Sequence, residues 1–428
     1  MRPRMSARIV VMAIFIALSI GDQMVAQEPV GTAQGLPGYT AIDLGTLGGT
    51  LSWATGINEA GWVDGFSNLT GDANQHAFLW RDGLMTDIGT LGGPNSGVSF
   101  WGRRPNALGQ VAGAGQTSAA DSAGEDFCAF INNFFSAPSA PFVCLPFVWR
   151  GGMITPLPTL GGNGNAAQVN NLGLVAGQVD VAPDPACTPQ TPRPQPVLWQ
   201  NGVLHKLPQL LGFPYGGPNA INDNGQAVGI LVSDCAATVA HAVLWSNGRA
   251  TYLGSLGGTV NDEAVDINNR SQVVGFSSLN GNLTFHGFLW TQSDGMQDVG
   301  TLPGDAASLA IGINDAGQIV GTSFDANGNP RAFLLHNGVM TDLNTLVPAS
   351  SPLFLLFAFD INSRGQIVGV AFDTVTQELH AYAASPTANA AVAGQGQKPN
   401  VQLPENVRAL LRQHIPIRHF GLRPFLPQ

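Results

Sequence analysis

A recurring ten-residue box constrains the fold of this chain more than any other feature. The box reads GINDAGQIVG at Gly312, and related copies stand at six other places. They are GINEAGWVDG at Gly56, RPNALGQVAG at Arg104, QVNNLGLVAG at Gln168, AINDNGQAVG at Ala220, DINNRSQVVG at Asp266 and DINSRGQIVG at Asp360. From Asn58 to Asn362, the box asparagines are 48, 64, 52, 46, 46 and 48 residues apart. Such a period indicates a repeat architecture.

Two further boxes follow the first in a fixed order. HAFLWRDG at His76 returns in the later units, with HAVLWSNG at His241, HGFLWTQSDG at His286 and a faded HAYAAS at His380 among its copies. DLGTLGG at Asp43 returns as DIGTLGG at Asp87, PLPTLGG at Pro156, LGSLGG at Leu253 and DVGTLPG at Asp298, with eroded copies at Leu207 and Asp342. Each unit therefore contains four short runs separated by turn signals, because Asn-x-x-Gly and Asp-Gly favour tight hairpins.

The repeat predicts an all-β fold, a seven-bladed β-propeller with four-stranded antiparallel blades. Four strands in about 46 residues is the size of a blade, and 54 glycines and 29 prolines suit many short strands and turns. The chain begins its repeats with a lone fourth strand, YTAIDLGT from Tyr39, and ends them with a third strand, HAYAAS. We therefore expect the N-terminal strand to complete the last blade and close the ring.

Two positions in every unit are restricted to small residues. Four residues before the box asparagine stand Ala54, Gly102, Ala166, Pro218, Ala264, Ala310 and Ala358. Seven residues after it stands a glycine in every unit, from Gly65 to Gly369. The first position is expected near the central axis, where backbones converge, and the second indicates close packing or a β-bulge.

The glycine-rich DLGTLGG box is not predicted to bind phosphate. A phosphate loop needs a helix immediately after it, and no helical pattern follows any copy. We interpret the box as the crossover from the outer strand of one blade to the inner strand of the next, where glycine permits close backbone approach.

Taken together, IN-x-x-GQ-VVG, HAFLW-x-x-G and DLGTLGG resemble the HAF-repeat family of bacterial extracellular proteins over about Tyr39 to Ala384. The resemblance implies export and a repeat-built β architecture. It implies no reaction, so no catalytic residue follows from it. The second and third units depart most. Arg103, Arg104 and Pro105 replace the usual start of the ten-residue box, and Pro146 stands where the HAFLW box has its histidine.

The N-terminus has the pattern of a secretory signal, with three arginines before an apolar run from Ile9 to Ile20. We predict a signal peptide at residues 1–26 with cleavage near Ala26; Ser19 and Gly21 offer another cut, and an uncleaved anchor is the alternative. No integral membrane segment is expected after cleavage. Export permits disulfides, and the pairs we expect are Cys128 with Cys144 and Cys187 with Cys235.

The predicted boundaries place the propeller at 36–384, a linker at 385–403 and a basic tail with a short helix at 404–428. The tail helix is expected from Glu405 to Ile415. From Ser385 onward, five Lys or Arg stand against one acidic residue. The tail therefore docks on the acidic ring, on a partner or on an anionic surface, or it stays unattached.

Residues that recur at equivalent positions of several units do not mark a special site. His76, His241, His286 and His380 are expected to form hydrogen bonds at strand edges, and Trp80, Trp149, Trp199, Trp245 and Trp290 to pack between blades. No catalytic constellation, metal site or cofactor is predicted; a structural Ca²⁺ at FDANGN (Phe324) or VNDEAVD (Val260) is the alternative. A net charge of −10 argues against nucleic-acid binding.

The places where the repeat breaks are the predicted ligand-binding positions. The second unit carries an enlarged segment from Gly115 to Leu145 that is either a packed flap or an apolar patch for a partner. Trp101, Arg103 and Arg104 interrupt its inner strand, and they either pair between blades, for instance with Asp360 or Asp266, or bind an anionic or sugar ligand at the channel mouth. The candidate ligand-binding residues are Trp101, Arg103, Arg104, Phe130, Phe134 and Phe135.

These features predict an exported, monomeric and non-enzymatic recognition or scaffold protein, located extracellularly, in the periplasm or at the cell surface. Its expected partner is a polysaccharide or an envelope protein, bound through the loop-bearing face. The first alternative is a propeller lyase or hydrolase at the channel mouth. The second is a purely structural surface protein without a soluble ligand.

Overall fold

The computed structural model describes residues 36–101, 104–122, 124, 127–128, 142–181, 193–390, 401 and 403–414, all within one compact body, Ala33–Gln428. The fold is all-β. Its described helices are the short 3-10 helix η1 (Leu343–Thr345) and α2 (Glu405–His414). Neither helix has the length and apolar content that a membrane span requires.

The strands form four-stranded antiparallel sets in chain order, and each set corresponds to one repeat unit. The first three sets are β2 (Gly48–Ile57), β3 (Val63–Leu69), β4 (Gln75–Arg81) and β5 (Leu84–Gly89); β6 (Gly92–Gly97), β7 (Val111–Ala120), β8 (Phe142–Arg150) and β9 (Met153–Pro156); and β10 (Gly164–Val169), β11 (Val175–Asp180), β12 (Pro194–Gln200) and β13 (Val203–Lys206). The next three are β14 (Tyr215–Ile221), β15 (Ala227–Val232), β16 (Ala240–Ser246) and β17 (Arg249–Tyr252); β18 (Gly257–Ile267), β19 (Val273–Leu279), β20 (Phe285–Thr291) and β21 (Gly295–Gly300); and β22 (Ala307–Ile313), β23 (Ile319–Phe324), β24 (Pro330–His336) and β25 (Val339–Asp342). The last set consists of β26 (Leu353–Ile361), β27 (Ile367–Asp373), β28 (Leu379–Ala390) and β1 (Pro37–Asp43).

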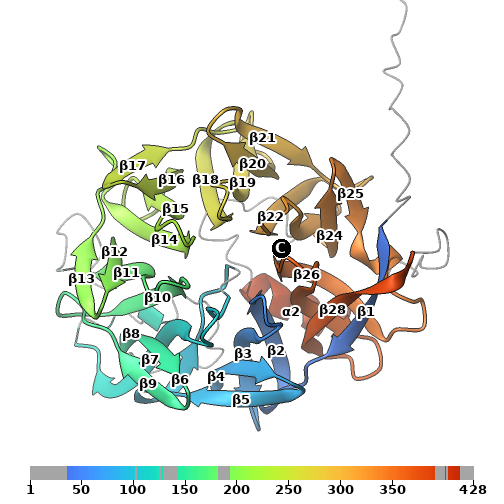
Figure 1. The fold of residues 1–428 in the computed structure, drawn as a ribbon, viewed down its shortest axis with the longest axis horizontal. Coiled ribbons are helices and arrows are strands. Elements are labelled where there is room, and N and C mark those ends of the chain that lie inside the picture. Colours follow the sequence, from blue (N-terminus) through green and yellow to red (C-terminus); the bar gives the residue numbers. More distant parts are fainter. Residues whose placement is uncertain are drawn as a thin grey trace, which may run out of the picture. The chain divides into compact units, whose positions relative to one another are not determined.

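The sets stand around a common centre, with β10, β14, β18, β22 and β26 on the inner side and β9, β13, β17, β21 and β25 toward the rim (Figure 1). Single parallel bridges, Leu51 to Leu379 and Ala240 to Asn261, join two pairs of neighbouring sets. The described strands therefore count as three four-stranded and two eight-stranded sheets.

Strand β1 completes the last set by pairing with β28, as the sequence predicts. Thr40 lies opposite Ser385 and Asp43 opposite Tyr382, and the Leu44 N–H donates to the Ala381 carbonyl oxygen at 2.9 Å. The strand β28 runs on to Ala390, six residues beyond residue 384, where the sequence places the end of the propeller. Residues 385–390, expected as linker, belong to this strand because β1 supplies partners for their backbone groups.

The box asparagines connect neighbouring units through a closed circuit of hydrogen bonds. Each Asn Nδ2 donates to the backbone carbonyl oxygen of the next box asparagine at 2.9 to 3.1 Å, and Asn362 donates back to Asn58. Each Oδ1 also accepts two N–H groups of its own turn, as Asn58 does from Ala60 and Trp62. One side chain thus holds both its hairpin and the contact to the next unit.

A β-bulge explains the two small-residue positions. The register of the inner strand shifts directly after the first small residue, for example between Ala54 and Gly56 and between Ala264 and Asp266. At the second position, a Cβ on Gly65 would lie 1.9 Å from the Trp53 carbonyl oxygen, and one on Gly275 would lie 2.0 Å from that of Glu263. Only glycine fits there, and the bulge re-aims the side chains that follow it.

The crossovers and the turns between second and third strands lie on one face of the molecule. In the first crossover, Gly45 and Gly48 take φ values of +78° and +102°. The Thr50 N–H that follows donates to Asp72 Oδ1 in the β3–β4 turn at 2.8 Å. The box asparagines stand at the other end of the inner strands, so the opposite face carries them.

The recurrent histidines and tryptophans are structural, as predicted. His76, His286 and His380 bind the aspartate of the DLG box at 2.9, 2.8 and 2.7 Å, and in the last pair Asp43 comes from β1. His241 differs, because Tyr252 replaces that aspartate and its ring stacks on the imidazole at 4.0 Å. The tryptophans pack in the apolar clusters between units; Trp199 and Trp245 are 1% and 2% exposed.

Helix α2 closes the crossover end of the central axis. Its Val407 and Leu411, together with Leu403, are buried in an apolar cluster with inner-strand residues such as Trp53 and Phe357. Other members, among them Leu51, Phe285, Phe324, Phe354 and Leu379, stand at the strand ends nearest the crossovers. Helix α2 therefore docks through apolar side chains.

Candidate functional site

The structure separates the predicted ligand-binding residues. Trp101 is 7% exposed and packs against Phe100 and Phe276 in the apolar cluster, so it belongs to the core and not to a binding surface. Arg104 lines a cavity on the box-asparagine face. The other four, Arg103, Phe130, Phe134 and Phe135, lie outside the described residues.

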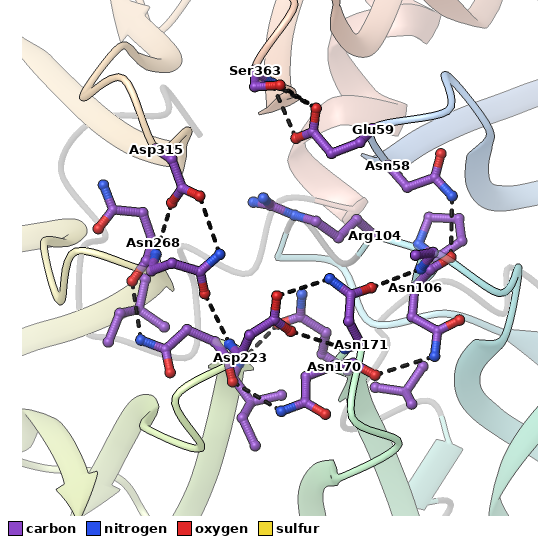
Figure 2. Close-up of a pocket in the computed structure, with 18 residues that line it drawn as sticks. Asn58, Glu59, Arg104, Asn106, Asn170, Asn171, Asp223, Asn268, Asp315 and Ser363 are labelled. Atoms are coloured by element: carbon purple, nitrogen blue, oxygen red, sulfur yellow. Dashed lines mark hydrogen bonds between the residues drawn. The ribbon is translucent and has the colours of Figure 1, made fainter.

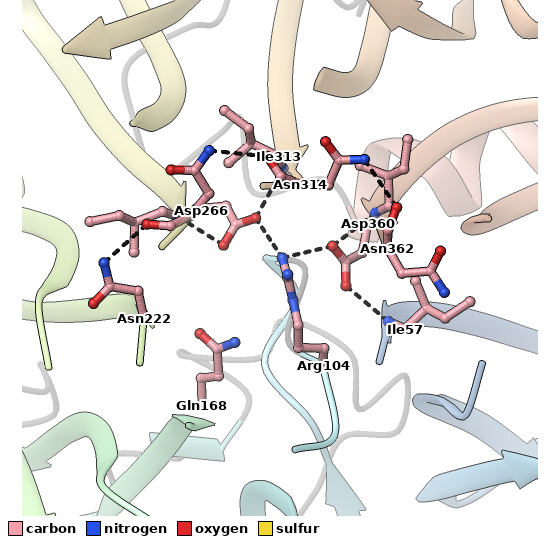
Figure 3. Close-up of polar contacts among 12 residues, drawn as sticks. Ile57, Arg104, Gln168, Asn222, Asp266, Ile313, Asn314, Asp360 and Asn362 are labelled. Carbon is pink, nitrogen blue, oxygen red and sulfur yellow. Dashed lines mark hydrogen bonds and ion pairs between the residues drawn. The ribbon is translucent and has the colours of Figure 1, made fainter. Parts of the chain in front are cut away.

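The Arg104 guanidinium lies at the centre of the molecule between two carboxylates (Figure 3). Its Nη2 donates to Asp266 Oδ2 at 2.8 Å and to Asp360 Oδ1 at 2.9 Å. These residues share the place two positions before the box asparagine, and a β-bulge directly precedes it in the units of Asp266 and Asp360. The pairing between blades that the sequence offered for Arg104 is therefore present, with both predicted partners.

The aspartates of this group also connect neighbouring units through the backbone. Asp360 Oδ2 accepts the Ile57 N–H at 2.9 Å, and Asp266 Oδ2 accepts the Ile313 N–H at 3.0 Å. Gln168, at the same position in the third unit, accepts the Ile221 N–H at 2.8 Å. In each case the donor N–H belongs to the next unit. The layer formed by Arg104, Asp266, Asp360 and Gln168 therefore stabilises the contacts between units around the axis.

Burial and mutual charge shift the pKa values in this layer. Burial raises the pKa of Asp360, Arg104 lowers it and Asp266 raises it further, with a net rise. For Arg104, burial lowers the pKa, but the attraction of Asp360 and Asp266 outweighs this and raises it. The arginine is therefore charged at every physiological pH, and its charge is matched by its two partners.

A cavity of about 330 Å³ opens above this layer on the box-asparagine face (Figure 2). Its floor includes Arg104, whose side chain is 23% exposed. The wall includes five of the box asparagines, from Asn58 to Asn268, and the residues that follow the box asparagines in the turns. The residues that follow are Glu59, Ala107, Asn171, Asp223, Asn269, Asp315 and Ser363.

The rim of the cavity is organised by hydrogen bonds from one turn to the next. The Asn171 N–H and Nδ2 donate to the two oxygens of Asp223 at 2.9 and 2.8 Å. Asn269 does the same to Asp315 at 2.8 and 3.1 Å. The Ser363 hydroxyl and N–H donate to Glu59 (Figure 2). These contacts hold the carboxylates in place around the opening.

The cavity combines polar side chains with apolar ones, among them Val169, Ile221 and Ile267. Among the described residues, its lining carries three carboxylates, Glu59, Asp223 and Asp315, and one basic group, Arg104, which is already paired with two aspartates. The lining side chains offer amide and carboxylate groups in a fixed geometry, which suits hydroxyl-bearing ligands. An anionic ligand, one of the two that the sequence suggested, is disfavoured by the acidic rim.

The enlarged segment of the second unit is held by a disulfide between Cys128 and Cys144, as predicted. Phe127 and both cysteines are fully buried with Ala114, which supports a packed flap at this point. Strands β7 and β8 extend into the segment, so the loop itself is shorter than Gly115 to Leu145. Cys235 is also disulfide-bonded, and Cys187, its predicted partner, lies outside the described residues.

None of the turns that line this cavity was predicted from the sequence as a ligand-binding site. The residues after the box asparagines vary among Glu, Ala, Asn, Asp and Ser, and this variation within a constant box was the available signal. Their convergence depends on the closed arrangement of the units, which no single turn reveals.

No protein-family model matches the chain, and no curated protein sequence matches it. Several solved structures resemble it. The β-propeller domain of the Trilobed protease from Pyrococcus furiosus is 8% identical, with a TM-score of 0.43 over 78% of this chain and 95% of that chain. An oligogalacturonate lyase from Vibrio parahaemolyticus is 10% identical, with a TM-score of 0.47 over 81% and 93%.

A further similar structure is the uncomplexed acylaminoacyl peptidase from Pyrococcus horikoshii, 9% identical with a TM-score of 0.47. The match covers 80% of this chain and 53% of the peptidase, so this chain spans about half the length of that enzyme. At such identities and scores, these likenesses transfer no activity or substrate to this chain.

Proposed function

We propose that this chain is a seven-bladed β-propeller of the HAF-repeat type and that it acts as an exported, non-enzymatic recognition protein. The blade number rests on the hydrogen-bond circuit, which returns to Asn58 after seven asparagines. Each eight-stranded sheet then consists of two blades joined by one parallel bridge. The Cys128–Cys144 disulfide supports export, because disulfides persist in oxidising compartments.

The proposed ligand is a neutral or amino-sugar saccharide whose terminal units enter the axial cavity. The cavity of about 330 Å³ carries this proposal, since its volume falls at the lower end of the range for ligand pockets, about 300–1,000 Å³. Sugar hydroxyls donate to carboxylates such as Asp223 and accept from amides such as Asn171. The three acidic side chains of the lining favour neutral or positively charged sugars over acidic ones.

A glycan array followed by calorimetry tests this function. We expect selective binding of neutral or amino-sugar oligosaccharides, and a loss of at least tenfold in affinity, about 1.4 kcal/mol, for Asp223→Ala. The control is Asp82→Asn, a fully exposed change in the β4–β5 hairpin. Equal affinities in both variants, or a preference for acidic glycans, would exclude the cavity as the saccharide site.

The enzyme alternative depends on Arg104, the one basic group among the described residues that line the cavity. A lyase or hydrolase at this position would lose turnover of a polysaccharide in Arg104→Ala. Turnover that survives this change excludes that version. A purely structural protein would bind no saccharide on the array and would show no turnover.

A further inference from the structure

The closure between β1 and β28 contains a histidine with more carboxylate neighbours than its counterparts in other units. His76 and His286 each bind the one aspartate of their DLG box through Nδ1. His380 binds Asp43 in the same way at 2.7 Å, and its Nε2 also binds Glu378 Oε2 at 3.1 Å. The last unit therefore departs from the repeat at the place where the two chain ends meet.

Asp373, the last residue of β27, adds a third carboxylate to this group. Ligand atoms of Asp43, Asp373 and His380 all lie within 4.8 Å of one another. With Glu378, three carboxylates surround one imidazole, so negative charge remains in excess even when the histidine is protonated. An additional cation would compensate this excess.

The Asp373 residue is buried, and within the described part of the chain only one of its two carboxylate oxygens accepts hydrogen bonds. It is 7% exposed, and its Oδ1 accepts the N–H groups of Val375 and Thr376 at 2.7 and 3.2 Å. Among the described residues, no hydrogen bond reaches its Oδ2. This oxygen therefore keeps its lone pairs available to a ligand.

In the sixth unit, a basic side chain balances the charge of two carboxylates. Arg331 occupies the position of His380, and its guanidinium binds Asp305 at 2.7 Å and Asp342 at 3.2 Å. There the cation is part of the protein. The seventh unit has a histidine instead, which is a metal ligand when it is neutral.

We propose that Asp43, Asp373 and His380 bind a divalent transition-metal ion, with Zn²⁺ the best match to one nitrogen and two carboxylate donors. His380 Nδ1 is the ligand, because it faces Asp43, while Glu378 holds Nε2 in the manner of the carboxylates that orient metal-binding histidines. Water takes the fourth position of a tetrahedral site. The ion would join β1 to β27 and β28, independently of any ligand in the axial cavity.

Zinc titration of the chelator-treated, full-length protein tests the site. We expect one Zn²⁺ to bind per chain and to raise the Tm by several degrees, whereas Ca²⁺ leaves it unchanged because the site includes a nitrogen ligand. Asp373→Asn should weaken Zn²⁺ binding at least tenfold. Asp298→Asn, which alters the single-carboxylate pair of His286, serves as the matched control and should bind zinc as before.

Replacement of zinc by Co²⁺ gives a readout that does not depend on stability. Tetrahedral Co²⁺ absorbs strongly in the visible region, and Glu378→Gln should weaken its binding about tenfold or more. The proposal is overturned if the wild-type protein shows neither bound zinc nor a cobalt band. It is also overturned if Asp373→Asn and Glu378→Gln both bind the metals as tightly as the wild type does.

Discussion

At the scale of single residues, buried polar side chains stabilise the contacts between repeat units as well as their own turns. Asn222, for example, accepts two N–H groups of its turn and donates to the Asn268 carbonyl oxygen at 3.0 Å. It is 4% exposed, so these groups have no access to water as a replacement. The box asparagine therefore stabilises both its own turn and the contact with the next unit.

Asn222→Ala should lower the free energy of unfolding by about 2–4 kcal/mol, because it leaves several buried donors and an acceptor unsatisfied. Urea unfolding measures this change. Asn280→Ala, in an exposed turn, is the control and should change stability by less than about 0.5 kcal/mol. Equal effects would show that the circuit does not contribute.

Asp262 should make stability depend on pH. Burial raises its pKa to about 6, although hydrogen bonds from Ser277 and Tyr252 lower it. Because the folded pKa lies above the ordinary value of 3.8, the protonated form is favoured in the fold. The contribution is complete below about pH 4 and is lost as the pH rises through about 6.

The wild-type protein should therefore lose more unfolding free energy between pH 4 and 6.5 than Asp262→Asn does, by an amount on the order of 2 kcal/mol. Urea titrations across this range measure the difference. A His241→Gln background removes the neighbouring imidazole, whose Nδ1 is 3.9 Å from Asp262 Oδ2, and isolates the titration of Asp262. Parallel pH profiles would contradict the assignment.

At the scale of elements, a local bulge and a distant helix decide what the central axis contains. A bulge directly precedes Asp266 and Asp360 in their inner strands, and both carboxylates bind Arg104. Helix α2 covers the apolar cluster at the opposite, crossover end. The cavity and the apolar cluster covered by helix α2 thus lie at opposite ends of one axis.

Val407→Asp should undock helix α2, because it places a charge at a side chain that is 1% exposed in the apolar cluster. We expect a lower Tm and increased binding of a hydrophobic dye to the uncovered cluster. Ala409→Asp puts the same residue on the exposed face of the same helix and is the matched control. If both variants behave alike, apolar docking of α2 is refuted.

At the scale of the whole molecule, the two ends of the repeat region depend on each other. β1 supplies the fourth strand of the last set, and the circuit of asparagines passes from Asn362 to Asn58. A closed arrangement has no exposed inner edge at which the first and last units can separate. The closing strand should therefore affect the stability of the whole.

Deletion of Tyr39 to Leu47 should lower the Tm markedly, because it removes the buried Tyr39 and leaves the edge of β28 unpaired. Differential scanning calorimetry measures the effect. A chain that begins at Leu36 retains the strand and serves as the control. An unchanged Tm in the deletion variant would refute the closure.

The sequence was sufficient to predict features that depend on local chemistry or on the repeat as a pattern. Asn-x-x-Gly turns, the Cys128–Cys144 pair and the N-terminal strand that completes the last set are all present. Arg104 has the two aspartates that the sequence proposed as partners, because all three hold the same position in their units. The pattern therefore predicted which positions are equivalent.

Only the tertiary structure decided what equivalent positions do when they meet. Arg104 pairs with two aspartates from other units, while Trp101, three residues earlier, enters the core. Asp43 and His380 are 337 residues apart, so their grouping with Asp373 depends on closure. A repeated sequence specifies each unit by short-range hydrogen bonds and packing, but a site shared by several units exists only once the chain has closed around its axis.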